Sequence, residues 1–116
     1  MTDHLDAEEL SSRVQGLFGR SLSVLRSTSS TMDDAEAAVR AGAPHGHVVV
    51  ANEQTKGRGA HGRDWLSPPG DDLYFSIVAR PDIPSSAMSL VTLATGLGVR
   101  EAIAALLPES RITVKW

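Results

Sequence analysis

The chain has 116 residues, a length that fits one small domain with its own hydrophobic core. Hydrophobic residues make up 41% and charged residues 22%, which excludes wholesale disorder, and the net charge of −3 gives no general indication of nucleic-acid binding. The sequence contains no cysteine, which excludes a disulfide scaffold, a thiolate metal site and a cysteine nucleophile and is compatible with the cytoplasm.

The first part of the chain is predicted to contain two helices separated by a strand. Apolar residues recur with helical spacing over residues 10–18, which predicts a first helix. Residues 21–26 alternate between polar and apolar and predict a short strand. Ser30 or Thr31 can then act as the N-cap of a second helix, which we expect to end at about Arg40.

Two further strands are expected on either side of a long loop. The β-branched run at residues 47–51 predicts a buried strand, and the apolar residues 73–79 predict the next one. Between them, the glycine-rich residues 55–70 show neither helical nor strand periodicity and are predicted to be a loop. Helices and strands in this order indicate an α+β fold, with one mixed sheet and flanking helices.

The last part of the chain is predicted to contain one long helix and a final strand. Ser85 or Ser86 can cap the helix, and Pro108 ends it. The longest uncharged run, residues 83–99, is short for a membrane span and contains a proline and two glycines, so we expect a buried helix rather than a membrane helix. Residues 111–116 resemble the start of a strand. Because the sequence ends there, we expect a truncated domain.

The loop contains the most informative motif of the chain, EQTKGRGAHGRDW at residues 53–65. Its glycines match the dinucleotide-binding pattern GxGxxG, but that pattern must open a helix, whereas this loop runs into a Pro-Pro-Gly segment. The same glycines resemble the start of a phosphate-binding P-loop, which needs lysine and serine or threonine where Arg63 and Asp64 stand. Both of these nucleotide-binding motifs are therefore excluded.

Positive charge is concentrated in this loop. Lys56, Arg58 and Arg63 lie in a stretch without any acidic residue. Together with backbone N–H groups exposed at the glycines, they could bind an anion such as a phosphate or a carboxylate. The same composition also fits a solvated hairpin loop. A nucleic-acid patch is a weaker alternative, because Trp65 alone could stack on a base.

The loop also resembles the signature loop of biotin–protein ligases, in which Gln-Thr precedes Gly-Arg-Gly-x-x-Gly-Arg-x-Trp. Three other segments resemble that family in order and spacing: residues 30–32 (Ser-Thr-Met), 73–76 (Leu-Tyr-Phe-Ser) and 115–116 (Lys-Trp). The resemblance implies that residues 21–116 are the N-terminal portion of a biotin–protein ligase catalytic domain, preceded by an N-terminal helix within residues 1–20. It implies the fold of class II aminoacyl-tRNA synthetase cores, which lipoate ligases share. Lipoate ligases lack this loop and are a more distant alternative.

The activity implied by the resemblance is an ATP-dependent, AMP-forming ligation. Biotin and Mg-ATP would give biotinyl-5′-AMP, and a lysine of the biotin carboxyl carrier domain of a carboxylase would then accept the biotin. We therefore expect biotin as substrate, ATP and Mg²⁺, but no metal site formed by the protein. We also expect a cytoplasmic location, no DNA-binding domain and no membrane association. The alternative is a truncated, non-catalytic remnant that keeps a partial biotin-binding loop.

The resemblance also assigns roles to individual residues. Biotin contacts are implied for Ser30, Thr31, Met32, Gln54, Arg58, Gly59 and Trp65. Nucleotide or phosphate contacts are implied for Gly57, Arg58, Gly59, Ala60, Arg63 and Lys115. Arg58 is the expected catalytic residue, because a fixed cation between two reacting anions lowers the barrier to their approach. Ala60 stands where many family members carry a second arginine, so we expect a weaker grip on the adenylate phosphate.

Overall fold

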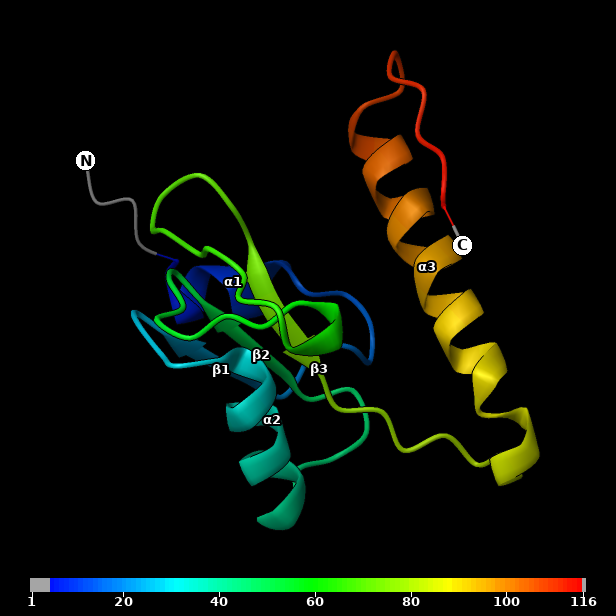
Figure 1. Cartoon of the computed structure of the whole chain (residues 1–116), viewed down its shortest axis with the longest axis horizontal. Coiled ribbons are helices and arrows are strands. Elements are labelled where there is room, and N and C mark those ends of the chain that lie inside the picture. The colour runs from blue at the N-terminus through cyan, green and yellow to red at the C-terminus, as the bar shows by residue number, and fades with distance from the viewer. Residues whose placement is uncertain (1–4, 116) are drawn as a thin grey trace. The chain divides into compact units, whose positions relative to one another are not determined.

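The computed structural model of the protein describes residues 5–115, and its contacts divide the chain into two units, Met1–Pro81 and Asp82–Trp116. Within the described residues, the first unit contains all the strands, and the second contains the longest helix (Figure 1). The expected division of the chain at residue 20 stays a prediction.

The first unit is built on one mixed sheet. Its strands are β1 (Leu22–Leu25), β2 (Val48–Ala51) and β3 (Tyr74–Ile77), and they lie in the order β1-β2-β3. Strand β1 is parallel to β2, whereas β2 is antiparallel to β3. The predicted mixed sheet is therefore confirmed, and each strand lies inside its predicted range.

Helix α2 (Thr31–Arg40) connects the two parallel strands and packs on β2 and β3. Of the two predicted caps, the structure uses Ser30, whose Oγ accepts the N–H of Met32 at 3.2 Å. Ala35 on the inner face of α2 packs against Val49 and Val78, and these three form the buried core. The start of α2 is thereby held against the end of the sheet that carries the glycine loop.

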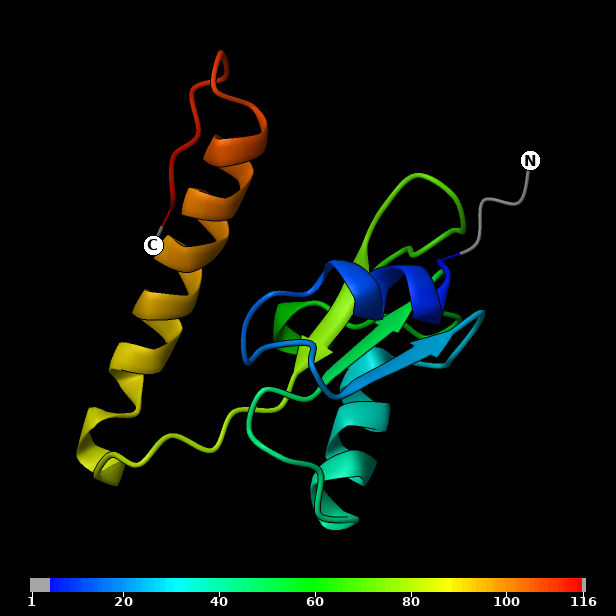
Figure 2. The ribbon, with the colours of Figure 1, turned by 180° about the vertical axis from the view of Figure 1, so that it is seen from behind.

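Helix α1 (Ala7–Arg13) lies on the opposite face of the sheet from α2, as Figures 1 and 2 together show, and it contacts β1. The predicted range, residues 10–18, is wrong at both ends. Asp6 starts the helix earlier by accepting a backbone N–H of the first turn, and Val14 ends it with an extended backbone at ψ 127°. The apolar residues after Val14 keep helical spacing but lie outside the helix.

Helix α3 (Ser89–Leu106) dominates the second unit and follows a short 3₁₀ turn, η2 (Ser85–Ala87). The predicted serine cap is wrong, because both candidate serines belong to η2 and α3 begins after Met88 with no side-chain cap. The expectation of a buried helix is also wrong. None of the residues of α3 is buried, since the described part of its unit holds no sheet or second long helix to cover it. By length and composition alone α3 could cross a membrane, with a mean hydropathy of 1.4, although core helices of soluble proteins meet the same criteria.

The predicted strand at residues 111–116 is wrong over residues 111–115, and Trp116 lies outside the described residues. The segment runs back beside α3 (Figure 1), where Arg100 Nε donates to the carbonyl of Ile112 at 3.0 Å. A strand needs a ladder of backbone hydrogen bonds to a neighbour, and this segment has no strand partner among the described residues.

Candidate functional site

A pocket of about 390 Å³ lies in the first unit, where the start of α2 meets the glycine loop and β3. Its lining residues are Ser30, Thr31, Met32, Gln54, Arg58, Gly59, Trp65, Leu73, Tyr74, Phe75 and Ser76. All seven residues that the resemblance implies for biotin are in this set, although they come from segments far apart in the sequence. The structure thus brings them to one cavity, and their contact with a ligand stays a prediction.

The parallel pairing of β1 and β2 explains why these segments meet. In parallel strands the chain leaves both at the same edge of the sheet, so the segment that enters α2 lies beside the segment that enters the glycine loop. Backbone hydrogen bonds continue this pairing beyond the strands, from Thr28 N to the carbonyl of Glu53 at 3.2 Å and from Thr55 N to the carbonyl of Thr28 at 2.8 Å. Both loops are therefore anchored where the pocket forms.

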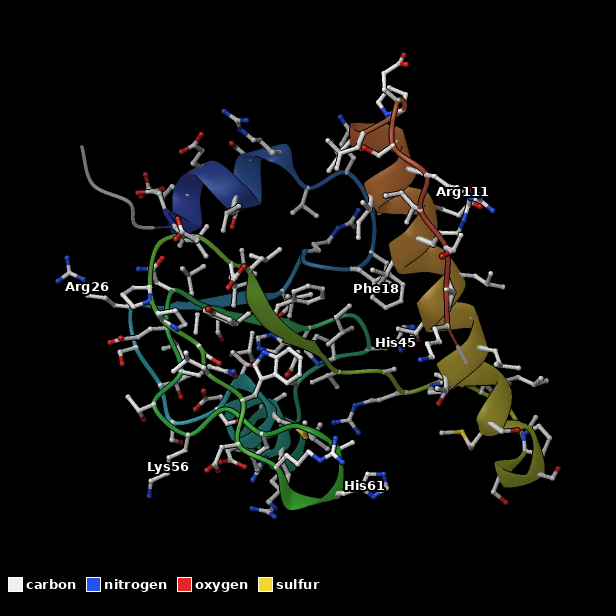
Figure 3. The ribbon with its side chains drawn as sticks, turned by 45° about the horizontal axis from the view of Figure 1, so that its top comes forward. Phe18, Arg26, His45, Lys56, His61 and Arg111 are labelled. Atoms are coloured by element: carbon white, nitrogen blue, oxygen red, sulfur yellow. The ribbon has the colours of Figure 1, made fainter. Side chains whose placement is uncertain are left out.

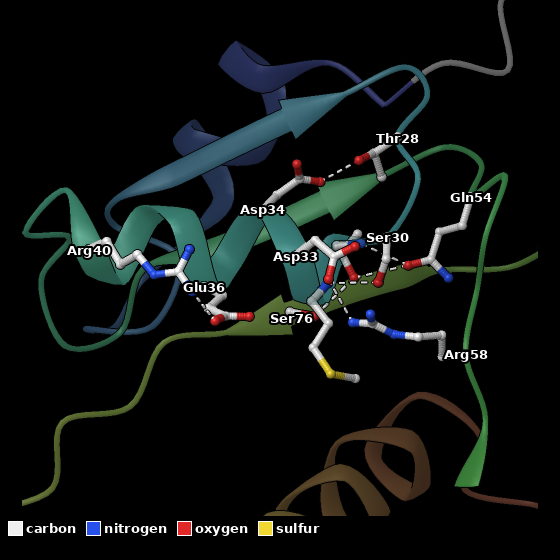
Figure 4. Close-up of polar contacts among 11 residues, drawn as sticks. Thr28, Ser30, Asp33, Asp34, Glu36, Arg40, Gln54, Arg58 and Ser76 are labelled. Atoms are coloured by element: carbon white, nitrogen blue, oxygen red, sulfur yellow. Dashed lines mark hydrogen bonds and ion pairs between the residues drawn. The ribbon is translucent and has the colours of Figure 1, made fainter. Parts of the chain in front are cut away.

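One end of the pocket is polar and tightly connected. Thr31, only 3% exposed, donates from its backbone N to Gln54 Oε1 at 2.9 Å, and its hydroxyl lies 3.2 Å from the same oxygen. The hydroxyl is also 2.9 Å from Ser76 Oγ on β3 (Figure 4). Gln54 Nε2 in turn donates to Ser67 Oγ at 3.0 Å. The amide of Gln54 therefore links α2 to the far side of the loop.

Arg58 brings a positive charge to the edge of the pocket. Its Nη2 lies 2.7 Å from Oδ1 of Asp33, in the first turn of α2 (Figure 4). Both side chains are about half exposed, 49% and 46%, so solvent screens the pair and it contributes little to stability. The pair leaves the other N–H groups of Arg58 available, since a guanidinium carries five donors.

Gly57 has a packing role that the sequence motif did not reveal. It is buried, and a Cβ placed on it would lie 2.4 Å from the carbonyl oxygen of Trp65 and 2.5 Å from Ser67 Oγ. Its own carbonyl accepts the N–H of Trp65 at 2.7 Å. Gly57 lines a second, larger pocket of about 770 Å³, together with Lys56 and Arg58. The absence of a side chain at position 57 is what lets the loop close on itself.

Two other residues with expected phosphate roles line neither of these pockets. Ala60 begins the short 3₁₀ turn η1 (Ala60–Gly62) at the tip of the loop, and Arg63 follows it. The carbonyl of Arg63 accepts the N–H of Gly59 at 2.7 Å. The N–H of Gly59 is therefore used inside the loop, and anion binding by the backbone of the loop stays a prediction. Lys115 belongs to the second unit, and its role stays a prediction.

The remaining basic residues of the loop tip face solvent. Figure 3 shows the side chains of Lys56 and His61 pointing away from the body of the unit. His61 adopts the left-handed conformation, with φ 60°, which shapes the turn at the loop tip. No group of three or more His, Cys, Asp or Glu that could hold a metal ion occurs within residues 5–115.

Sequence reasoning assigned no role to Tyr74 and Ser76, which line the pocket from β3. The Tyr74 hydroxyl donates to the carbonyl of Pro68 at 2.8 Å and lies 3.3 Å from the carboxylate of Asp72. Burial, and then the negative charge and hydrogen bond of Asp72, raise the pKa of Tyr74 above its ordinary value. Strand periodicity could have found this pair, because residues two apart on a strand share a face.

Comparison with known proteins gives the relatives of the chain. Residues 24–116 match the model of the Biotin/lipoate A/B protein ligase family. A biotin--[acetyl-CoA-carboxylase] ligase of Mycobacterium tuberculosis is 37% identical over 101 residues, covering 84% of this chain and 38% of that protein. A bifunctional ligase/repressor BirA of Bacillus spizizenii is 36% identical over 88 residues, covering 76% and 27%. The chain thus spans well under half of the length of these relatives.

Solved structures give the same picture. A biotin protein ligase from Aquifex aeolicus in complex with biotin and ATP matches with a TM-score of 0.67 and 36% identity, covering 84% of this chain and 39% of that one. A biotin protein ligase from Leishmania major in complex with biotinyl-5-AMP matches with a TM-score of 0.66 and 32% identity, covering 82% and 38%. The mixed sheet with flanking helices is therefore the fold of biotin protein ligases, and the chain belongs to the Biotin/lipoate A/B protein ligase family.

Proposed function

We propose that the pocket at the start of α2 binds biotin. The observation that carries this proposal is the combination of groups that line one pocket: the hydroxyls and the amide around Thr31 and Gln54, the apolar side chains of Met32, Trp65 and Phe75, and the cation of Arg58. Biotin offers a partner for each of these groups, with a hydrogen-bonding cyclic urea, an apolar ring and chain, and a terminal carboxylate. The relatives that act on biotin support the same ligand.

We further propose that the protein uses this site to form biotinyl-5′-AMP from biotin and ATP. The attack of a carboxylate on the α-phosphate brings two anions together, so a cation fixed beside both lowers the barrier. Arg58 lines the pocket, and its pairing with Asp33 holds one nitrogen of the guanidinium while the other donors stay available, which supports this role. Arg58 is accordingly the proposed catalytic residue, and the second pocket beside it is where the nucleotide would enter.

Magnesium does not fit a site built by the described residues. Residues 5–115 contain no cluster of metal-ligating side chains, and the carboxylate at the pocket edge, Asp33, is already paired with Arg58. Mg²⁺ commonly binds through substrate phosphates with few protein ligands. We therefore assign the expected Mg²⁺ to the phosphates of ATP and derive no step through a metal held by the protein.

The second half-reaction that we propose is transfer of biotin to a lysine of the carrier domain of a biotin-dependent carboxylase, in the cytoplasm. The names of the relatives from Mycobacterium tuberculosis and Paracoccus denitrificans, which specify acetyl-CoA carboxylase, support this class of acceptor. The lipoate branch of the family is the other candidate substrate class, and the glycine loop at the pocket favours biotin over it.

The direct test is ATP-dependent transfer of biotin to a purified carrier domain, followed by mass spectrometry. We expect a mass increase on one lysine that requires both biotin and ATP. Lipoate in place of biotin serves as the matched substrate control. Biotin binding without any transfer would instead identify a non-catalytic binding module, and transfer of lipoate in preference to biotin would contradict the proposal.

A further inference from the structure

The polar end of the pocket has a fixed hydrogen-bond direction. Gln54 faces the backbone N–H of Thr31, an obligate donor, so the atom at 2.9 Å from it must be the amide oxygen. That oxygen can only accept. The hydroxyl of Thr31, 3.2 Å away, therefore donates its single proton to Gln54, because otherwise two lone pairs would face each other.

Ser76 completes this arrangement from the neighbouring strand. Its Oγ lies 2.9 Å from Thr31 Oγ1. Since the proton of Thr31 is already directed to Gln54, the proton in the contact between the two hydroxyls must come from Ser76. The chain of donors thus runs from Ser76 to Thr31 to Gln54. One lone pair of Thr31 is left, and Thr31 lines the pocket.

We infer that Ser76 is a specificity-determining positioning residue: by donating to Thr31, it occupies one lone pair of that hydroxyl and keeps its proton on Gln54, so that the hydroxyl meets the ligand only as an acceptor. This inference rests on the proposed function, because the ligand group that such an acceptor selects is an N–H of the cyclic urea of biotin. A ligand with an oxygen at that place would put a lone pair against a lone pair, and the buried polar group would stay unpaired.

Two features of the site support a directing role for Ser76 over simple packing. Thr31 is 3% exposed, so water has little access to replace a missing donor. Ser76 pairs across the sheet with Val49, a core residue that is 1% exposed, so its backbone is held by the sheet whatever its side chain is. Removal of the hydroxyl alone should then free Thr31 to rotate without moving β3.

The test compares biotin with its two cyclic carbamate analogues, in each of which one ring N–H is replaced by oxygen. Dissociation constants are measured by calorimetry for the parent chain, Ser76→Ala and Ser76→Thr. We expect the preference for biotin over the more discriminated analogue to fall about three- to tenfold in Ser76→Ala, the range of one hydrogen bond. Ser76→Thr keeps the hydroxyl and should retain the preference. An unchanged preference in Ser76→Ala would overturn the inference.

A second measurement needs no ligand. The Thr31 hydroxyl proton, followed by NMR, should exchange with water faster in Ser76→Ala than in the parent chain or in the control Ser23→Ala. Ser23 is a strand serine that contacts His47 at 3.2 Å, away from the pocket. Equal exchange in Ser76→Ala and the parent chain would overturn the inference even if biotin binds. A parent chain that binds no biotin would overturn the proposed function, while the exchange rates would still decide the role of Ser76.

Discussion

The glycine at position 57 allows a sharp test of how the loop closes. In Gly57→Ala, the new Cβ would lie 2.4 Å from the Trp65 carbonyl oxygen and 2.5 Å from Ser67 Oγ, which is about 1 Å inside ordinary contact. The first neighbour is backbone and cannot swing away. Either the loop opens or its hydrogen bonds break, including the one from Trp65 N to the carbonyl of Gly57 at 2.7 Å.

The cost of this substitution can be estimated from two contributions. Overpacking costs about 1–3 kcal/mol, and the loss of one loop hydrogen bond costs about 0.5–1.5 kcal/mol. We therefore expect a decrease of about 2–4 kcal/mol in the free energy of unfolding, or a decrease of about 10 °C or more in the Tm of a domain of this size. Biotin binding should weaken as well, because Arg58 and Gly59 follow directly in the loop.

Two other glycines of the loop serve as matched controls. At Gly59 the backbone has φ −100°, and an added Cβ would make only ordinary contacts, at 3.4 Å with Trp65 Cε3 and at 3.6 and 3.7 Å with the carbonyl oxygen and Cβ of Arg63. Gly59→Ala should therefore change the stability by less than about 0.5 kcal/mol. At Gly62 there is open space but a φ of +72°, so Gly62→Ala should cost about 1–2 kcal/mol from backbone strain alone. Thermal melts of the three variants check this order. A Gly57→Ala variant as stable as Gly59→Ala would refute the close approach of the loop segments.

Three further predictions concern the proposed activity and the pocket. Arg58→Ala should abolish adenylate formation in a ligase-active form of the protein, and pyrophosphate–ATP exchange within about tenfold of the parent would contradict the catalytic role. Ala60→Arg should slow the release of preformed biotinyl-AMP by about 10- to 150-fold, the effect of one charge-assisted hydrogen bond of about 1.5–3 kcal/mol, and equal release rates would mean that position 60 does not face the phosphate. Tyr74, the only tyrosine in the sequence, should titrate above its usual pKa when its absorbance is followed in the folded protein. Because the folded-state pKa is raised, the contribution of Tyr74 to stability is complete below pH of about 10 and lost as the pH rises through the raised value, a dependence that Tyr74→Phe should remove.

Helix caps and strands that depend on neighbouring residues could be predicted from short patterns in the sequence. The β-branched run within residues 47–51 and the cap of α2 at Ser30 each act through the backbone of their own neighbourhood, and the structure confirms both. The mixed sheet also followed, because the order of helices and strands restricts how they can pair. The family resemblance identified residues that line one pocket. It could do so because family motifs for one ligand name residues that meet in space, even where they lie far apart in the sequence.

Other features depended on contacts that no local pattern contains. The spacing of residues 10–18 is helical, yet Asp6 and Val14 set different helix ends, and residues 111–115 have strand character but no partner strand among the described residues. The pairing of Arg58 with Asp33 and the contact of Thr31 with Ser76 join residues 25 and 45 positions apart. Such pairs exist because the chain leaves the parallel strands β1 and β2 at the same edge of the sheet at which it enters the antiparallel strand β3. The sequence by itself therefore determined which side chains are present at the site. The tertiary structure alone decided which of them form hydrogen bonds or ion pairs with one another.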